Sequence, residues 1–163
     1  MVIGILLGSV MAGAVSSRTE GREVKKAVKI EMVEPGQDLE EKFLLLAELG
    51  FDGVELPSPN PWSVAEVLAA RDASGLPVHG VVCSEHWASP LNHPEESVRA
   101  KCVAAIREAI SDAAAYGASS VLVVPGVVNK TMSYEDAWSL SRESIAMVVP
   151  DAEQAGIDIA FEN

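Results

Sequence analysis

The sequence predicts an α/β fold in which about five short strands, joined by four helices, form one parallel sheet. Apolar, β-branched segments alternate along the chain with longer segments that carry helix-capping residues. Every connection is helical, and strands joined in this way are parallel, with right-handed crossovers. The chain has 163 residues, of which 48% are hydrophobic and 22% charged, which is enough apolar material for the core of one domain.

The predicted strands are short runs rich in apolar and β-branched residues. They cover residues 28–32, 53–56, 78–82, 120–124 and 158–162. The fourth strand is continuously apolar, which is typical of a sheet covered on both faces. The fifth strand is expected to be buried, and it carries Glu162 at its C-terminal tip. The proline-rich segment 57–61 is predicted to be a loop.

Each predicted helix has start and stop signals. The capping residues are Asp38 with Glu41, Ser63 with Glu66, and Ser133. Pro94 suits the beginning of the third helix. The helices are expected to end at Gly50, Gly75, Gly117 and Gly156. Because proline lacks a backbone N–H, Pro150 should kink or restart the fourth helix.

Two architectures fit parallel strands with helical connections. A doubly wound sheet would carry a glycine-rich phosphate loop after the first strand, and residues 33–36 do not form one. The alternative is a barrel, and at the spacing of these strands eight units would need about 250 residues, the usual size of a (β/α)8 barrel. The sequence therefore predicts a partial (β/α)8 TIM barrel, with residues 28–163 as its N-terminal half.

Residues 1–27 are expected to lie outside the barrel, as a signal-peptide remnant or a linker. Residues 2–15 form an uncharged apolar run of the length of a signal-peptide h-region, too short to span a bilayer comfortably. No Lys or Arg precedes the run, so a basic n-region is missing. The mature chain is predicted to have no membrane span, and to be exported or periplasmic if residues 1–14 are a signal-peptide remnant, and otherwise cytoplasmic.

Charge and cysteine content exclude other classes. The net charge of −12 would repel a phosphate backbone, and no patch of Lys or Arg offsets it, so nucleic-acid binding is not expected. Cys83 and Cys102 have neither metal-ligand spacing nor the density of a disulfide framework. Both are predicted to be buried small hydrophobic residues.

Four segments carry a family resemblance. They are residues 50–56 (GFDGVEL), His86-Trp87 with Pro90-Leu91, residues 123–126 (VVPG) and residues 156–163 (GIDIAFEN). In their order and spacing they resemble the xylose isomerase-like TIM-barrel superfamily, and within it the sugar phosphate isomerase/epimerase group. The likeness covers residues 28–163. It implies a metal-dependent isomerase or epimerase that acts on a small sugar or sugar phosphate by proton transfer through an enediolate.

The resemblance places Glu162 at the first metal-binding glutamate of that family. A carboxylate at this position would hold a divalent metal, Mn²⁺ or Mg²⁺ in the first place and Co²⁺ or Zn²⁺ as alternatives. The same carboxylate would act as the catalytic group that transfers a proton beside a carbonyl, which the metal would polarise. The remaining ligands of the family belong to strands six to eight, beyond Asn163. The truncated chain is therefore expected to have an incomplete active site and to be inactive.

Two further residues are candidates for substrate binding. His86 follows the third strand, where a neutral imidazole would hydrogen-bond a substrate oxygen. The alternative is an exposed loop histidine packed on Trp87. Glu55 ends the second strand and would point into the barrel mouth. His79 lies inside an apolar strand and is expected to be a core histidine.

Three other functions stay open. An inositol-type sugar dehydratase of the same superfamily cannot be separated from an isomerase with half a barrel. A metal-dependent apurinic endonuclease is disfavoured, because its pattern has a histidine where this chain has Val124, and because the chain is acidic. A non-catalytic half-barrel fragment would expose strand edges and bare helix faces, through which it would self-associate.

Overall fold

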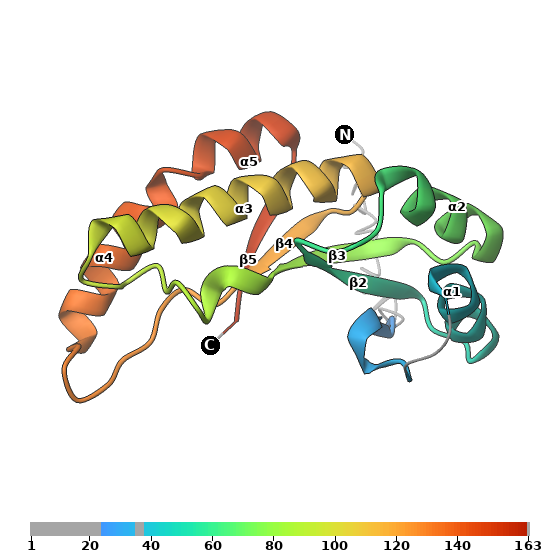
Figure 1. Cartoon of the computed structure of the whole chain (residues 1–163), viewed down its shortest axis with the longest axis horizontal. Helices are drawn as coiled ribbons and strands as arrows, with labels where there is room; N and C mark the ends of the chain where they lie inside the picture. Colours follow the sequence, from blue (N-terminus) through green and yellow to red (C-terminus); the bar gives the residue numbers. More distant parts are fainter. Residues whose placement is uncertain (1–23, 35–37, 163) are drawn as a thin grey trace, which may run out of the picture.

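Five parallel strands form a single sheet in the computed structural model, which describes residues 24–34 and 38–162 (Figure 1). The strands are β1 (Ala27–Lys29), β2 (Gly53–Ser58), β3 (Val78–Cys83), β4 (Ser120–Val123) and β5 (Asp158–Phe161). Each pairs with the next along the chain, in the order β1-β2-β3-β4-β5. This is the order predicted for a partial (β/α)8 barrel, whereas a doubly wound sheet reverses its order at a switch point. The predicted signal-peptide-like run, residues 2–15, lies outside the described residues.

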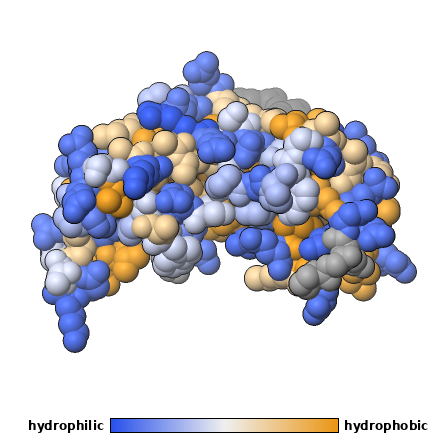
Figure 2. Space-filling model, viewed as in Figure 1, coloured by the Kyte–Doolittle hydropathy of each residue, from blue (hydrophilic) through white to orange (hydrophobic). Residues whose placement is uncertain are grey.

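The described residues also form five α-helices and two 3-10 turns. They are α1 (Leu39–Glu48), α2 (Val64–Ser74), α3 (Glu96–Tyr116), α4 (Tyr134–Ala146), α5 (Val149–Ala155), η1 (Ile30–Met32) and η2 (Ser84–His86). Right-handed crossovers between sequential strands place the helices on one face of the sheet. Figure 1 shows α2, α3 and α5 along this outer face, and the space-filling view in Figure 2 shows an arch that is hollowed on the opposite side. Within the described residues, no helix is long and apolar enough to cross a membrane.

The hydrophobic core lies between the sheet and the layer of helices. Strand side chains that are fully buried there are Val54, Leu56, Val81, Val121 and Val123. They belong to one cluster with Phe43 of α1 and Ile106 of α3. Burying each large side chain of this kind stabilises the fold by roughly 1.5–3 kcal/mol. Cys83 and Cys102 are buried in the same cluster as free cysteines, as predicted.

The predicted side-chain caps are confirmed, but α3 begins at Glu96 with Glu95 as its N-cap, so Pro94 precedes the helix and does not lie in its first turn. Asp38 and Ser63 each accept a hydrogen bond from the backbone of the residue three positions on, and Glu41 and Glu66 bond back to complete both capping boxes. Helices α2, α3 and α5 end at glycines with left-handed backbone, Gly75, Gly117 and Gly156. Pro150 lies in the first turn of α5, so the fourth predicted helix is in fact two, α4 and α5.

Two strand ends differ from the prediction by more than one residue. β1 ends at Lys29, and residues 30–32 form a 3-10 turn. The prediction of a loop from residue 57 is wrong for Pro57 and Ser58, which continue β2. The pairing of β1 with β2 stops where Lys29 meets Glu55. Beyond that point no described strand pairs with this edge of β2, so the missing N–H of Pro57 interrupts no strand pairing there.

The expectation that β5 is buried is wrong. Among the described strands β5 pairs with β4 alone, and the side chain of Phe161 is 52% exposed. The expectation of a sheet covered on both faces is also wrong for the described residues, because the helices lie on one face (Figure 1). The apolar character of a strand indicates that it is suited to burial, but it does not reveal which neighbours cover it.

Candidate functional site

A cleft on the open face of the sheet brings the three predicted site residues together. Its volume is about 480 Å³, within the usual range of ligand pockets. It is lined by Ala27, Val28, Lys29, Glu31, Met32, Glu55, Val82, Ser84, His86, Trp87, Leu122 and Glu162. Glu55 comes from β2, His86 from the turn after β3, and Glu162 from the end of β5. Parallel barrels hold their active sites at these C-terminal strand ends.

Glu162 follows β5 directly and continues its pairing with β4. Its backbone N–H donates to the carbonyl of Val123 at 3.2 Å, which fixes the tip of the strand. Side chains alternate along a strand, so Glu162 shares a face with Ala160. Ala160 pairs in register with Leu122, whose side chain lines the cleft. The exposed carboxylate of Glu162 is therefore accessible from the cleft.

His86 is buried and held in one tautomer. Its side chain is only 3% exposed, and the backbone N–H of Val124 donates to its Nδ1 at 3.3 Å. A neutral imidazole that accepts at Nδ1 carries its proton on Nε2, which is then a hydrogen-bond donor. Burial lowers the pKa of His86 below its ordinary value; the nearby carboxylate of Glu162 opposes this shift, and the ammonium of Lys29 adds to it. The imidazole is therefore neutral at pH 7.

The alternative of an exposed loop histidine is wrong, although the contact with Trp87 exists. The two rings meet edge to face, with centroids 5.2 Å apart and planes at 81°. Trp87 itself is 66% exposed at the rim of the cleft. The 3-10 turn η2 directs the histidine inward and leaves the tryptophan outside.

Glu55 lies on the floor of the cleft. Its Oε1 is 3.7 Å from Nε2 of His79, and a side chain on Gly80 would begin 3.7 Å from the same oxygen. The prediction that His79 is a core histidine is wrong, because its side chain is 51% exposed. The register between β2 and β3 shifts between Val54 and Glu55, so His79 is an extra residue that breaks the alternation expected of the strand.

Two residues that shape this site are not found by sequence reasoning. Lys29 lines the cleft and pairs with Glu31, with Nζ 2.7 Å from Oε2. In the sequence, Lys29 is one polar residue within a short predicted strand, and nothing in the pattern marks it as a site residue. Asn92 is 2% exposed in the loop after β3, and both ends of its amide bond the backbone of Val127, at 2.7 and 3.0 Å. A single loop asparagine gives no signal in the sequence that it joins two loops.

Further bonds tie the loop that carries His86 to α4. Ser144 of α4 donates to the carbonyl of Leu91 at 2.8 Å, and Ser141 donates to the carbonyl of Pro125 at 2.6 Å. With Asn92 these contacts join the loops after β3 and β4 into one rigid rim. The position of His86 therefore depends on several residues that never reach the cleft.

The donors present fit part of a metal site. Glu162 supplies the oxygen that Mg²⁺ or Mn²⁺ prefers. Among the described residues, the cleft is lined by three carboxylates, Glu31, Glu55 and Glu162, and one ammonium, Lys29, and this charge suits a cation. In residues 24–34 and 38–162, however, no three His, Cys, Asp or Glu side chains gather into a group that could hold a metal ion.

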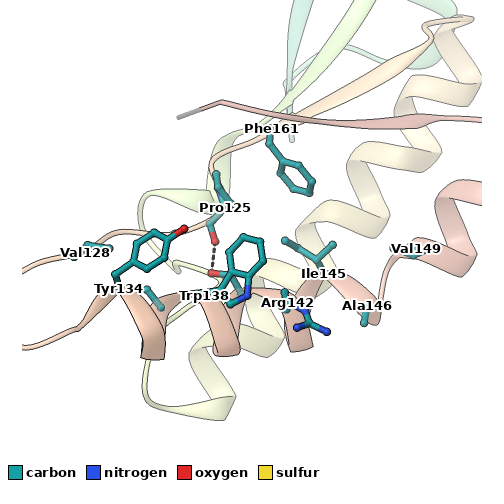
Figure 3. A pocket seen from close by; sticks show the side chains of 12 residues that line it. Pro125, Val128, Tyr134, Trp138, Arg142, Ile145, Ala146, Val149 and Phe161 are labelled. Atoms are coloured by element: carbon teal, nitrogen blue, oxygen red, sulfur yellow. Dashed lines mark hydrogen bonds between the residues drawn. The ribbon is translucent and has the colours of Figure 1, made fainter.

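A second, larger groove lies on the outer side of β5. Its volume is about 710 Å³, and its walls are mostly apolar. Figure 3 shows Phe161 of β5 facing Trp138 and Ile145 of α4 across it. The rings of Tyr134 and Trp138 stack at 6.5 Å. Arg142 is the only charged residue among the described residues that line it, and none of them is a carboxylate or an imidazole.

Comparison with solved structures shows the fold. A D-tagatose 3-epimerase-like protein has a TM-score of 0.70 at 24% identity, over 86% of this chain and 53% of that one. The 3-keto-D-glucoside 4-epimerase of E. coli has a TM-score of 0.69 at 19% identity, over 85% and 56%. The D-psicose 3-epimerase of Clostridium cellulolyticum H10, solved with D-tagatose, has a TM-score of 0.67 at 20% identity, over 83% and 51%.

The chain thus spans about half the length of these three proteins. No curated protein matches the sequence. A family defined as xylose isomerase-like TIM barrels matches residues 43–163, which is most of the chain. Together with the sequential parallel sheet and the cleft at its C-terminal edge, this match shows that the chain belongs to the xylose isomerase-like TIM-barrel family.

Proposed function

We propose that the chain provides one half of a sugar isomerase or epimerase site, in which Glu162 transfers a proton while His86 and Glu55 bind the substrate. The observation that supports this most is the convergence of an exposed carboxylate, a buried neutral imidazole and a second carboxylate in one cleft. Groups with different protonation states that meet at the mouth of such a fold are suited to acid–base chemistry.

The proposed reaction begins with removal of a proton from the carbon beside the sugar carbonyl. The carboxylate of Glu162 accepts this proton, and the electron pair of the broken C–H bond moves toward the carbonyl oxygen to give an enediolate. The Nε2–H of His86 donates to a substrate oxygen and stabilises its developing charge. A proton delivered from water to the opposite face of the same carbon gives an epimer, and Glu162 then releases the first proton to water. Transfer of the proton from Glu162 to the neighbouring carbon, with a hydroxyl proton of the enediolate moving to the other oxygen through water, gives an isomer.

Glu162 is also the residue that would hold a divalent cation, with Mn²⁺ or Mg²⁺ proposed and Co²⁺ or Zn²⁺ as alternatives. When bound, such an ion would polarise the substrate carbonyl. The excess of carboxylates in the cleft supports a cation there.

The proposed substrate class is a small sugar. The similar structures are, by their descriptions, epimerases of D-psicose and of a 3-keto-D-glucoside and a D-tagatose 3-epimerase-like protein, and one D-psicose 3-epimerase was solved with D-tagatose. At the identity found here these likenesses establish the fold, so the sugar is part of the proposal.

We further propose that the 163-residue chain by itself has no turnover and self-associates. The exposed edge of β5 and the apolar groove beside it favour this second property, because large apolar patches on a monomer tend to be covered by a partner.

The test is exchange of a substrate C–H proton into deuterated water, with D-tagatose and D-psicose as substrates and Mn²⁺ or Mg²⁺ added. It is applied to the polypeptide of the whole reading frame and to the 163-residue chain. In the polypeptide of the whole reading frame, Glu162→Gln should abolish the exchange and weaken Mn²⁺ binding. Glu153→Gln, an exposed helix site on α5, is the matched control and should change neither.

Two results would contradict the proposal. If the Glu162→Gln variant still exchanges the substrate proton, the carboxylate of Glu162 does not take part in the reaction. Metal-dependent turnover by the 163-residue chain at ordinary enzyme rates would show that it is not inactive. Loss of water from the sugar during the same assay would instead identify a dehydratase.

A further inference from the structure

We propose that the ion pair of Lys29 and Glu31 is a sugar-binding subsite, which holds two neighbouring hydroxyl groups at the end of the substrate farthest from Glu162. The inference rests on the proposed function and adds the residues that recognise the rest of the sugar. It depends on the place of the pair in the cleft, on its geometry, and on its small contribution to the stability of the fold.

The pair lies across the cleft from Glu162. In the described sheet, β1, which ends at Lys29, and β5, which precedes Glu162, are the outer strands, and β3, which leads to His86, is the middle one. The charges of Lys29 and Glu162 both reach the imidazole of His86, where they shift its pKa in opposite directions. A sugar whose reacting carbon lies at Glu162 and whose carbonyl oxygen meets His86 would therefore extend toward Lys29 and Glu31.

Strand pairing turns Lys29 toward the cleft. Lys29 pairs in register with Glu55 of β2, so both side chains lie on the same face of the sheet. The Nζ of Lys29 is 2.7 Å from Oε2 of Glu31, and both residues line the cleft. An ammonium has three N–H donors, and one suffices for the bond to Glu31. The pair can therefore keep its own contact and still donate to a ligand.

The turn η1 fixes the acceptor side of the pair. Ile30 is fully buried in the core, and the backbone N–H of Val33 donates to the carbonyl of Ile30 at 3.1 Å, which closes the turn. Lys42 of α1 donates to the carbonyl of Val33 at 3.2 Å. The backbone is thus held on both sides of Glu31. A binding group fixed in this way loses little entropy when a ligand binds.

The chemistry of the pair matches two hydroxyl groups on neighbouring carbons. Each sugar hydroxyl both donates and accepts a hydrogen bond, and two neighbouring hydroxyls lie about one hydrogen-bond length apart. An ammonium and a carboxylate that are themselves in hydrogen-bond contact can each bond one of the two. Hydrogen bonds to charged groups are roughly twice as strong as those between neutral groups. The subsite therefore favours a ligand that carries such a pair of hydroxyls.

The fold gains little from this ion pair, so a structural role does not explain its place. The side chains of Lys29 and Glu31 are 34% and 54% exposed, and ion pairs with this exposure contribute little to stability. The two residues are neighbours in the chain, so their contact joins no distant elements. The exposure that weakens the pair as a structural contact leaves it accessible to a ligand.

The test compares D-tagatose with D-erythrulose, a four-carbon ketose that keeps the carbonyl group and the C–H bond beside it but lacks the last two carbons and their hydroxyls. Equilibrium binding and kcat/KM for proton exchange are measured on the polypeptide of the whole reading frame, with Mn²⁺ added. The pH is 8, where His86 is neutral with or without the charge of Lys29.

Lys29→Met should weaken D-tagatose binding and lower its kcat/KM about tenfold, and Glu31→Gln should do so by less. Neither variant should change the values for D-erythrulose. The matched control is Lys101→Met, at an exposed lysine of α3 outside the cleft, and it should change the values for neither sugar. The urea midpoint of Lys29→Met should equal that of the parent, which separates a binding role from a structural one.

Several outcomes would overturn the inference. An equal effect of Lys29→Met on both ketoses would show that Lys29 acts through His86 or through the fold. Unchanged D-tagatose binding in Lys29→Met would exclude the subsite, as would the absence of saturable D-tagatose binding to the parent. D-tagatose binding that depends on Lys29, in a protein that exchanges no substrate proton, would keep the subsite and refute the proposed function. Exchange that depends on Glu162 but not on Lys29 would do the reverse, so the two failures are distinguishable.

Discussion

Replacing Asn92 by alanine should destabilise the protein by about 1.5–3 kcal/mol, because it removes the clamp between the two loops at the cleft. The amide of Asn92 makes two hydrogen bonds to the backbone of Val127, at 2.7 and 3.0 Å, and its side chain is almost fully buried. Each such bond contributes roughly 0.5–1.5 kcal/mol, and leaving the half-buried groups of Val127 without a partner adds to the loss.

The assay is equilibrium unfolding in urea, followed by circular dichroism at constant slope m, so that a change in midpoint reports stability alone. Asn129→Ala is the matched control. Asn129 is exposed, and within the described part of the chain its side chain accepts hydrogen bonds from the backbone N–H and the hydroxyl of Thr131 alone, in its own turn. The control should cost about 0.5 kcal/mol or less.

A second readout connects this clamp to the site. Burial is the main cause of the lowered pKa of His86, so a loosened rim should let that pKa rise toward its ordinary value, which NMR titration of the imidazole would detect. If Asn92→Ala costs no more stability than Asn129→Ala, and leaves the titration of His86 unchanged, the argument for a rigid rim is refuted.

Three other outcomes are expected. The imidazole of His86 lies near Glu162 and Lys29, and its pKa is lowered from 6.5, so just below pH 6.5 the unfolded state binds more protons than the folded state. The free energy of unfolding of the metal-free protein should therefore fall as the pH drops through about 6.5. The variant His86→Gln should flatten this pH dependence in urea titrations. Ser63→Ala should cost about 1 kcal/mol in the same assay through loss of the α2 cap, whereas Ser139→Ala on the exposed face of α4 should cost almost nothing. Trp138→Glu should reduce the apparent mass that sedimentation gives for the self-associated 163-residue chain at high concentration, because Trp138 lines the apolar groove. An unchanged apparent mass would exclude the groove as the surface of self-association.

The sequence predicts features that depend on local chemistry. The capping boxes at Asp38 and Ser63, the glycines that end the helices and the restart at Pro150 all follow from bonds within one turn, and the structure confirms them. The sequential sheet follows from helical connections of one hand. The grouping of Glu55, His86 and Glu162 follows from the rule that parallel strands end at one edge.

The sequence does not predict features that depend on register or on distant partners. His79 is exposed because β2 and β3 slip by one residue at Glu55, a change that the alternation of side chains cannot reveal. Pro57 is tolerated in β2 because β1 is too short to pair with it. The length of a strand is poorly predicted from an apolar run. Asn92 and Lys29 matter through contacts across the fold, which no local pattern records.

Register also explains why this half of the barrel can carry a polar cleft on a largely apolar sheet. Lys29, Glu55, Gly80, Ser120 and Asp158 pair across the five strands as one row. Gly80, in the middle of the row, has no side chain, and any Cβ there would lie 3.2 Å from the hydroxyl of Ser120 and 3.7 Å from the carboxylate of Glu55. The contact with Ser120 would be tight, whereas the contact with Glu55 would be an ordinary van der Waals contact, so the missing side chain at Gly80 leaves room above all for the Ser120 hydroxyl. The slip at Glu55 and the missing side chain at Gly80 therefore act together, since a regular register would place His79 in this row instead of glycine. The shape of the cleft floor is a property of strand pairing, and it would be lost by a change of register that left every residue of the cleft in the sequence.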